Sequence, residues 1–269
     1  MTDTAVFEKL LRSDDKHVET LIERLYTQVL RPHHSAIDVG AHTGRHTIPL
    51  SKLLPNGRVI AIEALAEYAS RLADRIEKQA IENVTIISAA TQDDSSLKEL
   101  SFEFIPDRPG RSSIKSATKD SPINGKVMNF AVERRAVPAS TIDIILLEQN
   151  IAPDEVGFIK LDIEGGEFFA LKGAIGCLRS GRPIAAMESA IRAADTYGYT
   201  NAAMFEFFAS IDYVLLDIVG NAIDEISMRR FNEIVCCPRE ICAPIQNLLR
   251  REAEELLLTV DAASGAAAR

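Results

Sequence analysis

Residues 36–44 carry the strongest structural signal in the chain: Ala36-Ile37-Asp38-Val39-Gly40-Ala41-His42-Thr43-Gly44. The apolar run predicts a buried strand, the glycines a tight turn, and the residues from Thr43 to Leu54 a helix. A second predicted strand, 58–63, ends in Glu63, nineteen residues after Gly44. Glycines let the backbone approach a ligand, and an acid at the next strand end can bind both hydroxyls of a ribose. The pattern therefore indicates an α/β sheet that binds a nucleoside.

The spacing of the glycines indicates which kind of nucleoside. Dinucleotide-binding folds use G-x-G-x-x-G around a pyrophosphate, whereas Gly40 and Gly44 lie four residues apart with Asp38 before them. This spacing disfavours a nicotinamide-dependent dehydrogenase and favours a cofactor without phosphates. Asp38 is expected either to orient the turn or to bind an amino group of the ligand. We predict a cofactor site that includes Asp38, Gly40, His42, Thr43, Gly44, Glu63 and Ala64.

The composition excludes several classes of protein. The chain has 269 residues, 46% of them hydrophobic, and a net charge of -9, which argues against the basic surface of a nucleic-acid binder and against binding to a membrane surface. No apolar run reaches the roughly 20 residues needed to span a bilayer, and the polar N-terminus does not resemble a signal peptide. The four cysteines form no C-x-x-C pair and are expected to be reduced. We expect a cytoplasmic protein.

Strands and helices alternate along the chain, which predicts a doubly wound, mostly parallel sheet covered on both faces. Strands are expected over 83–90, 157–162 and 183–188, and two consecutive strands, 213–218 and 233–237, predict a closing antiparallel hairpin. Further helices are expected over 66–80, 140–148, 167–180, 202–210 and 245–260.

The same pattern suggests a division of the chain. Residues 1–34 are expected to form an N-terminal helical cap on an α/β domain, 35–245. An inserted β element, about 99–139, contains alternating stretches around a turn at 106–110 and a long loop. Residues 246–269 are expected to form a C-terminal helix and a small-residue tail that frays.

Polar residues at further strand ends complete the predicted site. Gln92 and Asp93 end the third strand and are expected to bind the base, although Asp93 also suits a turn. The stretch 158–167 predicts a buried strand opening onto acids, with Asp162 at the ligand-binding edge. Glu164 and Glu167 instead suit the start of the next helix. Glu188 ends another strand in the same way, and Lys160 is a possible counter-charge.

With these motifs in hand, the chain resembles the FkbM family of S-adenosylmethionine-dependent methyltransferases over roughly residues 35–190. The most specific match is Ile159-Lys160-Leu161-Asp162-Ile163-Glu164-Gly165-x-Glu167-x-x-x-Leu171-Lys172-Gly173-Ala174. Other matching features are the glycine motif, the strand ending in Glu63, Asn83-Val84, Arg111-Ser112-Ser113, Thr141-Ile142-Asp143 and Arg182-Pro183. The chain departs from the family at Ala64, where proline is usual, at His42, where asparagine is usual, and at the turn 90–93.

The resemblance implies a class I methyltransferase-like (Rossmann-like) fold, S-adenosylmethionine as the cofactor, and O-methylation of a hydroxyl on a sugar or a secondary metabolite. The acceptor is then a small molecule or a glycan. We expect Asp162 to act as the general base or to anchor the hydroxyl, with Glu164, Glu188 or His46 as alternatives. No metal ligands are assigned, although strand-end acids suit Mg²⁺, which some O-methyltransferases use.

Two other functions remain open at this stage. One is a non-catalytic S-adenosylmethionine-binding protein of the same fold. The other is a nucleic-acid-directed methyltransferase, because the insert is locally basic between Arg108 and Lys126. That basic stretch is interpreted either as a solvated loop or as a lid over the acceptor.

Overall fold

The computed structural model describes residues 15–106, 112–114, 122–123, 126–127, 131–188, 196–224 and 233–267. Within these residues a seven-stranded sheet has the order β11-β12-β10-β9-β1-β2-β3. Its strands are β1 (Ser35–Val39), β2 (Val59–Ile62), β3 (Val84–Ile87), β9 (Val156–Leu161), β10 (Ile184–Glu188), β11 (Tyr213–Asp217) and β12 (Glu233–Pro238). The neighbours from β3 to β10 pair in parallel, and β12 pairs antiparallel with β10 and β11. The predicted parallel sheet and closing hairpin are confirmed.

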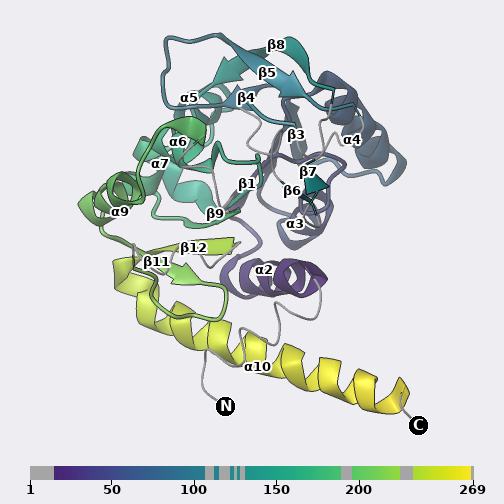
Figure 1. The fold of residues 1–269 in the computed structure, drawn as a ribbon, viewed down its shortest axis with the longest axis vertical. Coiled ribbons are helices and arrows are strands. Elements are labelled where there is room, and N and C mark those ends of the chain that lie inside the picture. Colours follow the sequence, from purple (N-terminus) through teal and green to yellow (C-terminus); the bar gives the residue numbers. More distant parts are fainter. Residues whose placement is uncertain are drawn as a thin grey trace.

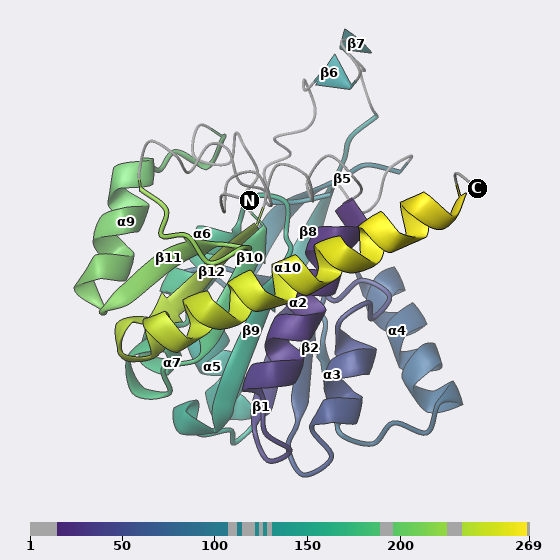
Figure 2. The same ribbon diagram turned by 90° about the horizontal axis from the view of Figure 1, so that it is seen from below.

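Helices cover both faces of this sheet (Figures 1 and 2). One face carries α2 (Asp15–Val29), α3 (Thr47–Leu53), α4 (Ala66–Lys78) and α10 (Cys242–Ala267). The other face carries α5 (Ile142–Glu148), α6 (Glu167–Lys172), α7 (Ile175–Ser180) and α9 (Asn201–Ser210). Because β1, β2 and β9 are buried on both sides, their sequences are nearly continuous apolar runs rather than alternating ones.

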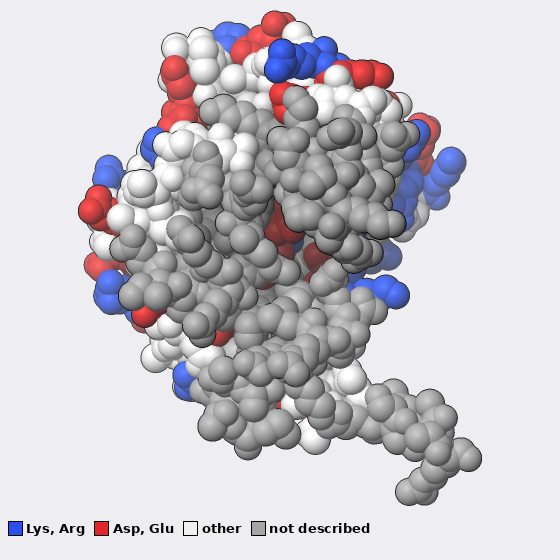
Figure 3. Space-filling view, viewed as in Figure 1, with Lys and Arg blue, Asp and Glu red and all other residues white. Residues whose placement is uncertain are grey.

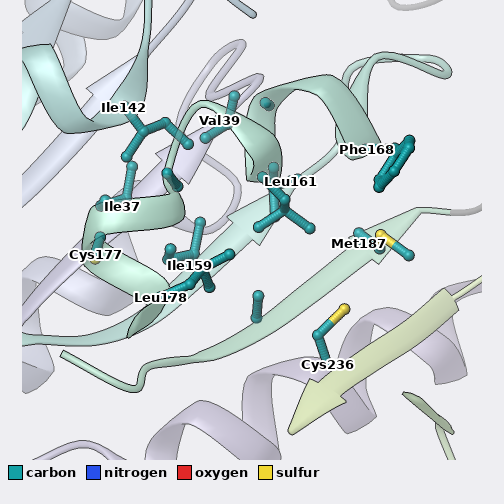
Figure 4. Packing of buried hydrophobic residues seen from close by; sticks show 14 of the residues in the cluster. Ile37, Val39, Ile142, Ile159, Leu161, Phe168, Cys177, Leu178, Met187 and Cys236 are labelled. Carbon is teal, nitrogen blue, oxygen red and sulfur yellow. The ribbon is translucent and has the colours of Figure 1, made fainter. Parts of the chain in front are cut away.

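Alternate residues of each central strand face the two layers. Ile37 and Val39 of β1 pack with Ile159 and Leu161 of β9 and with the helices α5 to α7 (Figure 4). Ala36 and Phe158 point to the opposite face, where they meet α2 and α10. The register of β1 against β9 is therefore fixed by burial, because a shift of one residue would exchange the two sets.

The insert forms a small sheet of its own beside β3. Strand β5 (Glu99–Phe104) pairs antiparallel with β8 (Glu133–Ser140), and β8 pairs in parallel with β4 (Ala90–Thr91). A short hairpin, β6 (Pro122–Ile123) and β7 (Lys126–Val127), lies between β5 and β8 in the sequence. Phe102 and Phe104 of β5 pack on Leu65 and Tyr68 at the start of α4. The insert is thus attached to the main sheet through an apolar contact.

Four predicted elements differ from the observed ones. The helix expected from Thr43 begins at Thr47, after a series of turns. The third strand is divided into β3 and β4, which belong to different sheets. The helix expected over 167–180 is interrupted at Gly173, where an added Cβ would lie 2.1 Å from the carbonyl oxygen of Gln92. The C-terminal tail, expected to fray, is helical to Ala267.

Several sequence expectations fall outside the described residues. They concern residues 1–14 of the predicted N-terminal cap, most of the turn 106–110, and most of the basic stretch between Arg108 and Lys126. Among the helices that the structure describes, none has the length and the apolar character needed to cross a membrane.

Candidate cofactor and active site

A cavity of about 260 Å³ lies where β1, β2 and β9 end, at the carboxyl edge of the sheet. This edge is where open α/β sheets bind their ligands. Eight of the predicted site residues line the cavity: Asp38, Gly40, His42, His46, Glu63, Ala64, Asp162 and Glu164. The surface view shows acidic atoms inside a hollow (Figure 3).

The glycine loop forms the floor of the cavity. Gly40 has a φ of 84°, and a Cβ on it would lie 1.9 Å from the carbonyl oxygen of Asp162. Position 40 therefore requires glycine for two reasons, since its φ is left-handed and the neighbouring strand end is too close. His42 also has a positive φ, 46°. Its ring stacks on Tyr68, with centroids 4.2 Å apart.

The carboxylate of Glu63 is fixed in place by the backbone. One oxygen accepts a hydrogen bond from the His42 N–H and the other accepts one from the Leu65 N–H, both at 2.9 Å. Burial raises the pKa of Glu63, while these two hydrogen bonds lower it. Each oxygen keeps a further lone pair, so Glu63 is suited to accept hydrogen bonds from a diol.

Asp38 is buried and orients the loop from below. Its Oδ2 accepts a hydrogen bond of 2.5 Å from the hydroxyl of Thr47, the first residue of α3. Burial raises the pKa of Asp38, against the opposing effects of His46 and Thr47. Asp38 was expected either to orient the turn or to bind an amino group of the ligand. Its hydrogen bond with Thr47 agrees with the first of these roles.

One end of the cavity is apolar. Its wall contains side chains from the β2–α4 turn, the end of the third strand and the insert: Leu65, Ala89, Ala90, Phe102 and Ile114. Thr91 adds a buried hydroxyl that has no hydrogen-bond partner among the residues that the structure describes. Such a wall suits a flat, largely apolar ring with polar edges. Phe102 and Ile114 were not predicted, because only the folded insert brings them to the cavity.

The residues at the end of β9 form an acidic edge. Asp162 lines the cavity, and Glu188 at the end of β10 shares a hydrogen bond with it. Burial and the charge of Asp162 raise the pKa of Glu188 well above its usual range. Glu164, also on the cavity, has a φ of 56°. A left-handed backbone at a non-glycine residue is a form of strain that often marks a functional site.

Behind this edge, two buried groups support the loop. Glu167 accepts hydrogen bonds from the backbone N–H groups of Ile163 and Gly165 at 2.8 and 3.2 Å. Burial raises its pKa to about 7 despite these bonds. Glu167 therefore holds the loop that precedes α6. Lys160 is fully buried and lies 2.7 Å from Glu233. Burial lowers the pKa of Lys160, but Glu233 and Asp162 outweigh that effect and raise it.

The opposite end of the cavity is charged, and part of it comes from helix α2. Glu19 of α2 lines the cavity together with Arg45 and His46 of the loop before α3. The Nε2 of His46 lies 2.6 Å from Glu19, and Arg45 forms an ion pair with Glu23 at 3.0 Å. Sequence reasoning missed Glu19, because nothing in the pattern of α2 distinguishes it from the other charged residues of an amphipathic helix.

The remaining predicted residues do not line the cavity. Gly44 packs against Leu72 of α4, and the carbonyl of Thr43 accepts a hydrogen bond from Arg75. The amide of Gln92 bonds to backbone groups at 94 and 97, while Asp93 pairs with Lys172. The structure thus places Thr91, rather than its two neighbours, in the cavity wall. For Gln92 and Asp93, contact with the base remains a prediction.

The described residues contain no group of three or more histidine, cysteine, aspartate or glutamate side chains arranged to hold a metal ion.

The sheet order, the glycine loop and the acid at the end of β2 together define a class I methyltransferase-like fold. The family model described as "Methyltransferase FkbM domain" matches residues 38–215, well over half of the chain. The chain belongs to the FkbM methyltransferase family, as its sequence motifs predict.

Several solved structures resemble this one. The methyltransferase FkbM from Methylobacillus flagellatus KT is 19% identical with a TM-score of 0.45, and the match covers 87% of this chain and 58% of that one. SMU.1697c of Streptococcus mutans, a putative methyltransferase in complex with SAH, is 12% identical with a TM-score of 0.45, over 81% and 96% of the two chains. This chain thus spans less than two thirds of the Methylobacillus protein. No curated protein matches it.

The residues present fit S-adenosylmethionine. Gly40 leaves room for a ligand to approach the backbone, and Glu63 offers hydrogen-bond acceptors for a ribose. The buried Thr91 hydroxyl has no partner in the described protein, in a wall that suits an adenine. The acidic edge that includes Asp162 suits the positive charge of a sulfonium.

Proposed function

We propose that this protein uses S-adenosylmethionine to methylate a hydroxyl group on a small molecule or a glycan. The observation that carries the proposal is that Glu63 and Asp162 line one cavity beside the glycine loop. Glu63 is suited to hold the ribose, and Asp162 is at the edge where a second substrate can enter. The FkbM family provides the reaction class.

When bound, S-adenosylmethionine supplies an electrophilic methyl group, so that the S–CH₃ bond breaks, an O–CH₃ bond forms and the hydroxyl releases a proton. The chain must align the hydroxyl and accept that proton. Alignment contributes up to about 7–11 kcal/mol in well-oriented reactions, and a general base about 10²–10⁴-fold in rate. Asp162 is the residue proposed for the second task.

The neighbours of Asp162 support this assignment. Asp162 is exposed and lines the cavity, whereas Glu188 is less exposed and does not, so Asp162 is the acid of this pair that a hydroxyl can reach. A hydrogen bond shared with Glu188 still leaves lone pairs on Asp162 for that hydroxyl. Glu188 is then a positioning residue, and Glu164, with its strained backbone, is the second candidate for contact with the acceptor.

The proposal is tested by incubating the protein with S-adenosylmethionine and a panel of sugars, phenols and aliphatic alcohols, and measuring release of S-adenosylhomocysteine. Turnover with a hydroxyl compound is expected, and Asp162→Asn is expected to lower kcat by about 10²–10⁴-fold with cofactor affinity unchanged. Asp154→Asn is the matched control, because Asp154 is exposed and precedes β9 whereas Asp162 follows it. If Asp162→Asn keeps turnover within a few-fold of wild type, the base assignment is wrong.

The same panel separates the alternative functions. A protein that binds the cofactor tightly but methylates no compound would be the non-catalytic binder, and methylation of an RNA or DNA arm would support a nucleic-acid substrate. The acidic residues Asp162 and Glu164 on the cavity argue against a polyanionic acceptor. A small neutral acceptor agrees with the net charge of -9.

A further inference from the structure

The two ends of the cavity differ in polarity. On the β3 side of Glu63 the wall is formed by Leu65, Ala90, Phe102 and other uncharged residues. On the β1 side it includes the charged groups of Glu19 and Arg45. S-adenosylmethionine has the same asymmetry, because the adenine is flat and uncharged whereas the methionyl end carries an α-ammonium and an α-carboxylate. With the ribose at Glu63, the charged end of the cavity corresponds to the methionyl end.

Glu19 is the acid on the cavity wall at the charged end. Its side chain is 30% exposed, and Oε2 is held by the Nε2 of His46 at 2.6 Å. His46 is itself buried and packs edge-on against Tyr26, which lies about two turns after Glu19 on α2. Burial raises the pKa of Glu19, but the hydrogen bond from His46 and the charge of Lys160 outweigh this and lower it. The carboxylate is therefore both ionised and oriented towards the cavity wall.

The other acids on the cavity are placed differently. Asp38 is only 3% exposed and accepts a hydrogen bond from the hydroxyl of Thr47, whereas Asp162 and Glu164 lie after β9, at the edge proposed for the acceptor. Arg45, on the same wall as Glu19, is already paired with Glu23. Glu19 is therefore the acid that the charged end of the cavity offers to an ammonium group.

We propose that helix α2, which lies outside the family match, completes the cofactor site, and that Glu19 binds the α-ammonium group of the methionyl end. This inference rests on the proposed function and adds a binding residue to it. A charge-assisted hydrogen bond of this kind is typically strong. The N-terminal helix is then part of the active site and not only a cap on the sheet.

The test compares two ligands that differ only at this end of the molecule. S-adenosylhomocysteine carries the amino-acid group, whereas 5′-methylthioadenosine keeps the adenosine and the sulfur but lacks the amino acid. Binding of both is measured by isothermal titration calorimetry for the wild type, Glu19→Gln and Glu23→Gln. Glu23 is the matched control, because it is one turn further along α2, does not line the cavity and forms only an exposed ion pair.

Glu19→Gln is expected to lower the affinity for S-adenosylhomocysteine by about 10–100-fold. Its affinity for 5′-methylthioadenosine is expected to stay within about 2-fold of the wild-type value. Glu23→Gln is expected to change neither ligand by more than about 2-fold. If Glu19→Gln binds S-adenosylhomocysteine as tightly as the wild type does, this inference is wrong, although the proposed function still holds. An equal loss of affinity for both ligands would also overturn the inference, because it would indicate a structural role for Glu19. A wild type that binds neither ligand would overturn the proposed function as well.

Discussion

Individual carboxyl groups in this site have different hydrogen-bond partners. Glu63 and Glu167 accept backbone N–H groups, Glu188 shares a hydrogen bond with Asp162, and Glu19 lies 2.6 Å from the Nε2 of His46. A buried carboxylate with such partners remains stable where an unpartnered one would cost several kcal/mol. The local partner, rather than the residue type, therefore determines what each acid can do.

Glu63→Gln tests the ribose contact at the level of one atom. The amide nitrogen of glutamine would face a backbone N–H that Glu63 now accepts from His42 or Leu65. The loss of one acceptor and the new repulsion are expected to lower the affinity for S-adenosylhomocysteine by about 10–100-fold. Calorimetry with S-adenosylhomocysteine measures this effect. An affinity equal to that of wild type would show that Glu63 does not contact the ligand.

Glu167 makes stability depend on pH. Burial raises its pKa to about 7 in the folded protein, whereas an exposed glutamate has a pKa of about 4.3. Between these values the folded state binds more protons than the unfolded state, so stability falls as pH rises through this window. The loss reaches about 3 kcal/mol for a shift of this size.

Glu167→Gln is expected to remove that contribution, because glutamine keeps an acceptor for the N–H groups of Ile163 and Gly165 but does not titrate. The variant should therefore gain stability relative to wild type as pH rises from about 4.5 to about 7. Urea unfolding at several pH values measures the difference. Parallel pH curves for the two proteins would contradict the assignment.

Among the elements, the loop after β1 depends on the close approach of Gly40 to β9. Gly40→Ala places a methyl group against the carbonyl of Asp162, and Gly198→Ala is the control, since its φ is 78° but nothing lies within 4 Å of the added Cβ. Gly198→Ala is expected to lower the free energy of unfolding by about 1–2 kcal/mol, because an alanine with a left-handed backbone is strained. Gly40→Ala is expected to lower it by at least about 2 kcal/mol more, and also to weaken cofactor binding. Denaturant unfolding and calorimetry measure both, and equal costs at the two positions would exclude the clash.

Elements with a clear period were predictable from the sequence, and their boundaries were less so. Apolar runs identify β1, β2 and β9, because these strands are buried on both faces. The start of α3 depends on the Asp38–Thr47 hydrogen bond, and the break at Gly173 depends on Gln92 from a distant segment. The tail predicted to fray is instead the helical end of α10, and the sequence carries a reason for this, since its alanines favour a helix.

The candidate site divides in the same way. Residues at strand ends, such as Glu63 and Asp162, were predictable because the carboxyl ends of parallel strands meet at one edge. Glu19, Thr91 and Phe102 line the same cavity, but only the packing of α2 and of the insert places them there. Pattern alone cannot distinguish a charged residue that faces a cavity from one that faces solvent.

At the scale of the whole molecule, α10 crosses α2 and extends beyond the sheet (Figures 1 and 2). Leu249 in its first half is 1% exposed and packs in the core with α2, whereas Leu258 is 70% exposed. Leu249→Ala is expected to cost about 2–5 kcal/mol of unfolding free energy. Leu258→Ala, the same change on the same helix, should stay within about 0.5 kcal/mol. Urea unfolding measures both, and similar losses would mean that α10 contributes little to the core.

The buried pair of Lys160 and Glu233 has a consequence for how the sheet is assembled. Lys160 on β9 reaches past β10, where its register partner is the small Ala186, to an acid on β12. If β12 joined the sheet one residue out of step, Glu233 would turn to the opposite face and leave an ammonium group stranded in the interior. The pair thus selects the correct register of β12 against β10, because it disfavours a shifted pairing that apolar contacts alone would tolerate.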